Sequence, residues 1–99
     1  KQLLKAGKTS GERTWRLPLW REFRPQLDSA IADIKNTGGS AGGTITAGWF
    51  LRDFVDDKVP WAHLDIAGTT WASDARGWQP KGATGIGVRL IHEWLRDCT

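Results

Sequence analysis

Residues 61–68 read WAHLDIAG, and this stretch decides the fold that we expect. Its side chains at Ala62, Leu64 and Ile66 are small or aliphatic and alternate with larger or polar side chains. Because successive side chains of a strand point to opposite faces, this alternation places the two sets on opposite sides. We therefore predict a strand over residues 61–68.

Helical periodicity precedes this predicted strand. Ala47, Phe50, Leu51 and Phe54 recur at i, i+3, i+4 and i+7, the spacing of one apolar stripe along a helix. The stripe predicts a helix of about four turns. Pro60 would prevent its continuation, because proline lacks the backbone donor that a helix interior needs.

A second helix is predicted at the end of the chain, beginning near residues 84–85. Its buried stripe is expected to comprise three apolar residues, Val88, Ile91 and Leu95. Arg89 and Glu93 have the i, i+4 spacing of an ion pair on the exposed side.

The first part of the chain is predicted to hold shorter elements. Residues 1–8 are expected to be the end of a helix that stops at Gly7, and residues 11–20 to be an extended linker. A short helix is expected near Pro25, and a short strand over residues 30–36. The order strand, helix, strand, helix indicates an α/β fold.

Length, charge and cysteine content restrict the class of protein. The 99 residues suit one small domain or part of a larger one, and the lack of Met favours a piece of a longer protein. The net charge is +3, with 14 basic residues scattered among 11 acidic ones, so neither nucleic acid nor a membrane surface is an expected partner. The single Cys98 suits a reducing cytoplasm.

Motifs of known catalytic chemistry are missing from the sequence. It has no HExxH, CxxC or GxSxG, and the adjacent Asp56 and Asp57 are expected to form a solvated helix end. His63 and Asp65 invite a catalytic interpretation. A buried strand-end carboxylate held by backbone amides is the expectation for Asp65.

Two further features have both a structural and a binding interpretation. The glycine-rich stretch over residues 38–43 precedes a predicted helix, but it lacks the lysine of a phosphate loop, so we expect a tight turn that allows close approach of helix and sheet. The seven tryptophans show no stacking period. Core and interface packing is therefore expected rather than binding of single-stranded nucleic acid or carbohydrate.

Four blocks of the sequence together resemble the leucine (cytosol) aminopeptidase family. They are GERTWRLPL at residues 11–19, ADIKNTGG at 32–39, WAHLDIAGT at 61–69 and KGATG at 81–85. The blocks stand in the family's order and at its usual intervals, with the helical segment ITAGWFL between the second and third. The resemblance implies that residues 1–99 are the C-terminal portion of a catalytic domain, part of an α/β/α sandwich with a mixed sheet flanked by helices.

The resemblance also implies the activity of the whole protein, which is release of N-terminal amino acids from peptides with two divalent ions, Mn²⁺ or Zn²⁺. The family's metal ligands are a lysine and several carboxylates, some within the motif NTDAEGR, and all lie upstream of this segment. No catalytic residue and no metal ligand is therefore expected here. The chain alone is expected to bind no metal ion and to be inactive.

This segment is expected to contribute part of the wall of the substrate pocket. In the family, the alanine at the end of the IAG strand and the residue three places later line the pocket for the substrate's N-terminal side chain, and here these are Ala67 and Thr70. Ligand crevices of α/β sheets lie at such strand ends. Thr70 makes the wall shorter and more polar, which argues against a strict leucine preference. Gly39 and Ser40 are expected to border the side of the leaving peptide.

The expected partners follow from the same resemblance. They are a peptide substrate, the rest of the catalytic domain and further copies of the protein in a homohexamer, in the cytoplasm. The alternative is a non-catalytic α/β module that binds a partner or assembles subunits through its tryptophans.

Overall fold

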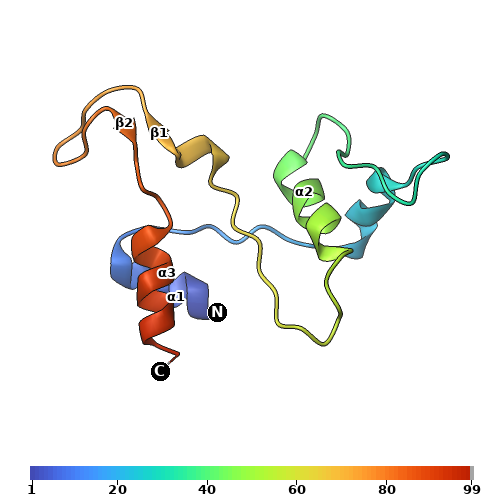
Figure 1. Cartoon of the computed structure of the whole chain (residues 1–99), viewed down its shortest axis with the longest axis horizontal. Coiled ribbons are helices and arrows are strands. Elements are labelled where there is room, and N and C mark those ends of the chain that lie inside the picture. Colours follow the sequence, from blue (N-terminus) through green and yellow to red (C-terminus); the bar gives the residue numbers. More distant parts are fainter. Residues whose placement is uncertain (99) are drawn as a thin grey trace. The chain divides into compact units, whose positions relative to one another are not determined.

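The computed structural model describes residues 1–98, which divide into two units (Figure 1). Unit 1 combines residues 1–16 with residues 65–98, and unit 2 comprises residues 17–64. The described residues contain three α-helices and one two-stranded sheet, so helix and strand are both present. None of the helices in this described part is long and apolar enough to cross a membrane.

Unit 1 is built on the packing of α1 (Gln2–Ser10) against α3 (Val88–Arg96). Ala6 and Leu90 are buried, and the Lys5 ammonium bonds the Asp97 carboxylate at 2.6 Å across the pair. Helix α1 ends at Ser10 and is capped by Gly11, whose φ of 77° is the left-handed conformation that favours glycine. Figure 1 shows the two helices, blue and red, side by side.

A small hairpin completes unit 1. Strand β1 (Trp71–Ala72) pairs antiparallel with β2 (Gly82–Ala83), with Trp71 opposite Ala83. The 3-10 turn η2 (Ala67–Thr69) precedes β1. The hairpin therefore joins η2 to the segment that enters α3.

Unit 2 packs the 3-10 helix η1 (Arg21–Leu27) against α2 (Gly43–Arg52). Leu27 is fully buried, and the Trp49 indole donates a hydrogen bond to the carbonyl of Trp20 at 2.9 Å. The Arg24 guanidinium bonds Asp53 at 2.7 Å and also pairs with Asp28. These contacts connect the two helices of the unit.

The predictions of both longer strands are wrong for this chain. Residues 61–66 have no regular secondary structure, and residues 30–36 form bends and coil. The Ser29 hydroxyl accepts hydrogen bonds from the amides of Ile31 and Ala32, which makes a turn there. An alternating pattern becomes a strand only when another strand supplies the hydrogen-bonded ladder, and no described residue forms a β-ladder with either segment.

The helix predictions are correct in place but not in detail. Helix α2 ends at Arg52, so it has fewer turns than predicted, and Phe54 lies beyond it. The helix near Pro25 is a 3-10 helix that starts at Arg21 with the proline inside. Helix α1 continues through a buried Gly7 instead of stopping there, and the predicted linker over residues 11–20 is confirmed as irregular.

The predicted buried stripe of α3 is wrong. Val88, Ile91 and Leu95 are 69%, 43% and 52% exposed, whereas Leu90 is buried. The physical reason is that α3 carries a second face, and that face packs against α1. The predicted pair of Arg89 with Glu93 is also wrong: Arg89 bonds Glu12, and Glu93 bonds Arg96.

The tryptophans are less buried than expected for a core. Four of the seven are clearly exposed, namely Trp15, Trp20, Trp71 and Trp78. Core packing is therefore wrong for these four. Interface packing stays a prediction for them.

Candidate functional site

The turn that carries Ala67 and Thr70 is held by a set of short-range hydrogen bonds. The Ala67 amide donates to Oδ1 of Asp65 at 3.0 Å, and the Thr70 hydroxyl donates to the Ala67 carbonyl at 3.3 Å. Thr69 donates both its amide and its hydroxyl to the Ile66 carbonyl, at 2.9 and 3.0 Å. Ala67 and Thr70 are both exposed, so the turn presents them on the surface of unit 1.

Asp65 and His63 each contact a residue close to them in the sequence. Asp65 accepts a backbone amide as expected, but it is exposed rather than buried, so the burial prediction is wrong. His63 stacks on Trp61 with 6.3 Å between ring centroids. Both contacts join residues two apart in the sequence, in keeping with the structural interpretation.

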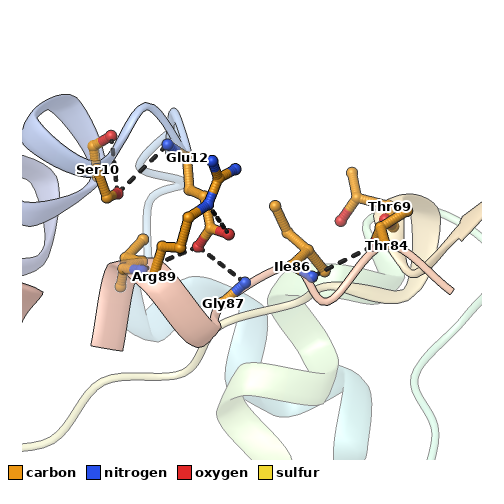
Figure 2. Close-up of polar contacts among 9 residues, drawn as sticks. Ser10, Glu12, Thr69, Thr84, Ile86, Gly87 and Arg89 are labelled. Atoms are coloured by element: carbon orange, nitrogen blue, oxygen red, sulfur yellow. Dashed lines mark hydrogen bonds and ion pairs between the residues drawn. The ribbon is translucent and has the colours of Figure 1, made fainter. Parts of the chain in front are cut away.

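Thr84 connects this turn to the start of α3 (Figure 2). Its hydroxyl donates to the Thr69 carbonyl at 2.7 Å, and its amide donates to the Thr70 carbonyl at 2.9 Å. The same hydroxyl accepts a hydrogen bond from the Ile86 amide at 3.2 Å. Thr84 lies within the KGATG block, but no pattern in the sequence marks its hydroxyl as functional.

Glu12 holds the other end of this segment. Its Oε2 accepts hydrogen bonds from the amides of Gly87 at 2.9 Å and Leu90 at 3.0 Å, and its Oε1 accepts one from Nε of Arg89 at 3.3 Å. Figure 2 shows the carboxylate at the first turn of α3. The Arg89 guanidinium also lies 4.9 Å from the Trp78 ring centroid, a cation–π contact.

This carboxylate replaces a cap that α3 lacks locally. The first turn of α3 has no acidic residue and its N-cap Gly87 makes no side-chain bond. Free amides and the positive end of the helix dipole both favour an anion there. The role of Glu12 has no local signal in the sequence, because the helix that it caps is remote in sequence.

The buried position of Glu12 affects its acidity. Its side chain is only 3% exposed. Burial alone would raise the pKa, but the hydrogen bonds from Leu90, Arg89 and Gly87 outweigh it and hold the pKa below its ordinary value. Glu12 is therefore an ionised anchor at neutral pH.

Gly39 and Ser40 lie in unit 2, in the bend before α2, and both are exposed. The neighbouring Gly38 approaches α2 closely, since a Cβ on it would be 2.7 Å from Cγ2 of Thr46. The predicted close approach to a helix is thus confirmed, but the predicted approach to a sheet is wrong, because residues 17–64 contain no strand. Ala67 and Thr70 belong to unit 1, whereas Gly39 and Ser40 belong to unit 2.

The described residues do not offer a site for two metal ions. Within residues 1–98, no three His, Cys, Asp or Glu side chains gather closely enough to hold a metal ion. A two-metal centre needs several such donors around ions about 4 Å apart. The described residues therefore contain no donor set for such a metal pair.

Comparison with known proteins decides the family. The family model of the cytosol aminopeptidase family, catalytic domain, matches residues 1–92. This chain belongs to that family. A probable cytosol aminopeptidase of Geotalea uraniireducens is 57% identical over 96 residues, which cover 97% of this chain and 19% of the relative. The aminopeptidase segment thus spans about a fifth of the length of that curated relative.

Two solved structures have the same fold as this chain over nearly all of its length. The bottromycin maturation enzyme BotP matches with a TM-score of 0.92 and 43% identity over 98% of this chain and 22% of BotP. The cytosol aminopeptidase of Coxiella burnetii matches with a TM-score of 0.88 and 34% identity, covering 97% of this chain and 21% of that one.

Proposed function

We propose that this chain is a C-terminal part of an aminopeptidase catalytic domain that supplies pocket wall and scaffold. The observation that carries the proposal is the exposed turn of Ala67 and Thr70, which is held by backbone-directed hydrogen bonds rather than by a core. A turn of this kind presents side chains in a defined position. We propose that both residues contact the substrate's N-terminal side chain, and that Gly39 and Ser40 border the leaving peptide.

The other elements of the whole enzyme are proposals as well. We propose that two divalent ions, Mn²⁺ or Zn²⁺, are bound by residues outside this segment, since the described residues lack a suitable donor set. Two such ions polarise a carbonyl and activate water for peptide hydrolysis. A cytoplasmic homohexamer with an α/β/α sandwich is proposed for the complete protein, with its remaining chain covering the exposed stripe of α3.

A non-catalytic module is not favoured. The curated relative matches nearly the whole of this chain and is named as an aminopeptidase. The exposed tryptophans are equally consistent with contacts to the rest of a catalytic domain.

The first test concerns the chain by itself. The purified 99-residue chain is expected to hydrolyse leucyl-p-nitroanilide no faster than buffer, with or without Mn²⁺ or Zn²⁺, because its described residues offer no metal-holding group. The complete enzyme under the same conditions is the positive control. Release of nitroaniline above background by the purified chain would contradict the absence of catalytic residues.

The second test concerns the pocket wall in a complete enzyme that carries this segment. Ala67→Phe is expected to lower kcat/KM for leucyl substrates about tenfold more than for alanyl substrates, since a larger wall residue leaves less room for a larger side chain. Ala75→Phe is the matched control, because Ala75 is exposed in the hairpin loop. Equal losses for both substrates would show that Ala67 is scaffold.

A further inference from the structure

We propose that Thr84 is a positioning residue for the substrate wall, acting through its hydroxyl group. The proposal rests on the proposed function of Ala67 and Thr70 as wall residues. It adds a specificity-determining residue that lies outside the wall itself. We call residues 67–70 the wall turn. The observation behind the proposal is that Thr84 donates hydrogen bonds to two successive carbonyls of this turn, those of Thr69 and Thr70.

The two hydrogen bonds of Thr84 act on different parts of the turn. The amide bond to the Thr70 carbonyl lies next to the β1–β2 ladder and continues it, so it survives any substitution that keeps an amide. The hydroxyl bond to the Thr69 carbonyl is specific to the side chain. Thr69 itself donates hydrogen bonds to the Ile66 carbonyl. The turn is therefore held by a bond to Ile66, which directly precedes it, and by a bond from Thr84, which is more distant in the sequence.

The orientation of the hydroxyl is determined by its neighbours. A hydroxyl has one hydrogen to donate and lone pairs to accept. Because the Ile86 amide donates to this oxygen, the hydroxyl hydrogen remains available for the Thr69 carbonyl. The side chain is thus a fixed spacer between the wall turn and the entry to α3.

The entry to α3 is itself held in place. One residue after Ile86, the Gly87 amide bonds the buried Glu12 carboxylate. Hydrogen bonds join Glu12 to Gly87, Ile86 to Thr84, and Thr84 to the wall turn (Figure 2). The peptide bond between Ile86 and Gly87 completes the connection from Glu12 to the wall turn. Glu12 holds the start of the helix, and Thr84 sets the distance from that start to the wall.

The solvent exposure of the Thr84 hydroxyl distinguishes a positioning role from a contribution to the stability of the fold. The bond from the Thr84 hydroxyl to the Thr69 carbonyl is exposed, and the bond that the hydroxyl accepts from the Ile86 amide is only part-buried. Water can therefore replace both when the hydroxyl is removed, with little loss of stability. The position of the turn is what the substitution changes. Loss of the spacer lets the wall shift relative to the substrate, and a large N-terminal side chain that fills the pocket is affected more than alanine.

The test uses a complete enzyme that carries this segment, with Thr84→Val, Thr84→Ser and Thr9→Val. Valine has the shape of threonine without its hydroxyl, and serine keeps the hydroxyl. Thr9→Val is the matched control, because it removes an exposed hydroxyl that bonds the Lys5 carbonyl in the same unit. Readouts are kcat and KM for leucyl and alanyl substrates, together with Tm.

For Thr84→Val, the leucyl-to-alanyl ratio of kcat/KM is expected to fall about fivefold, the usual worth of one neutral hydrogen bond. The change should be mainly in KM, and Tm should stay within about 2 °C. Thr84→Ser should restore the ratio to within about twofold of wild type, and Thr9→Val should not change it.

Several outcomes would overturn the proposal. An unchanged ratio in Thr84→Val, an equal loss for both substrates with a lower Tm, or a failure of serine to restore the ratio would each refute the role of the hydroxyl. Ala67→Phe separates this failure from that of the wall. If Ala67→Phe shifts the ratio and Thr84→Val does not, only the positioning role fails. If neither does, the wall assignment fails.

Discussion

Replacing Glu12 by alanine is expected to destabilise unit 1 by about 3 kcal/mol, because a buried amide left without its partner costs about 1–3 kcal/mol. The Glu12 carboxylate bonds the amides of Gly87 and Leu90 and the side chain of Arg89, so all three lose a partner at once. The start of α3 also loses the negative charge that its dipole favours.

The measurement is urea unfolding of the chain, followed by circular dichroism, with hydrogen exchange at the Leu90 amide as a local probe. The Leu90 amide is buried and should lose its protection in Glu12→Ala. Asp97→Ala is the matched control, since Asp97 forms an exposed ion pair with Lys5 across the same helices and such pairs contribute little. Equal losses in the two variants would show that the cap is unimportant.

The sign of the pH dependence follows from the lowered pKa of Glu12. A carboxyl whose pKa is lower in the folded state stabilises the fold fully above its unfolded pKa and loses this contribution as the pH falls through the folded pKa. The difference in unfolding free energy between wild type and Glu12→Gln should therefore be constant near neutral pH. It should shrink below about pH 4.5, the ordinary value of this group. A difference that persists unchanged in acid would contradict the ionised cap.

Replacing Gly7 by alanine is expected to cost about 2 kcal/mol, although alanine is intrinsically the better helix former by about 1 kcal/mol. A Cβ at Gly7 would lie 2.8 Å from the Glu12 carbonyl oxygen and 3.0 Å from Oγ1 of Thr14. The Glu12 backbone cannot move away freely, because its side chain is bonded to α3. The clash therefore pushes residues 12–14, which follow α1, away from that helix.

Gly43→Ala is the control for this prediction. Gly43 is the first residue of α2, and a Cβ there would meet nothing within 4 Å. That variant should be neutral or more stable, whereas Gly7→Ala should lower Tm by several degrees. If thermal unfolding shows that Gly7→Ala also gains stability, the close approach of residue 12 to α1 does not hold.

Ala67 and Thr70 show how much of the candidate site could be predicted from the sequence. Ala67 and Thr70 were proposed from a resemblance, and the structure places both on an exposed turn. Neither Thr84 nor Glu12 was predicted, because their function depends on partners in other segments. The hydroxyl of Thr84 acts by bonding the carbonyl of Thr69, and the carboxylate of Glu12 acts by accepting hydrogen bonds from amides at the start of α3.

The sequence by itself determined the family and the places of the main helices. Four ordered blocks were sufficient for the family, and helix periodicity is readable because each backbone bond joins residues four apart. The tight turn before α2 was readable too, because glycines permit it locally.

Only the tertiary structure decided which face of α3 is buried and which extended segments become strands. Helix α3 has two apolar stripes, and periodicity cannot say that Leu90 packs inward while Ile91 stays exposed. Residues 61–66 have the alternation of a strand but remain irregular here. A strand depends on a partner strand, and the cap of α3 depends on Glu12, so in both cases the deciding contact comes from a residue distant in sequence.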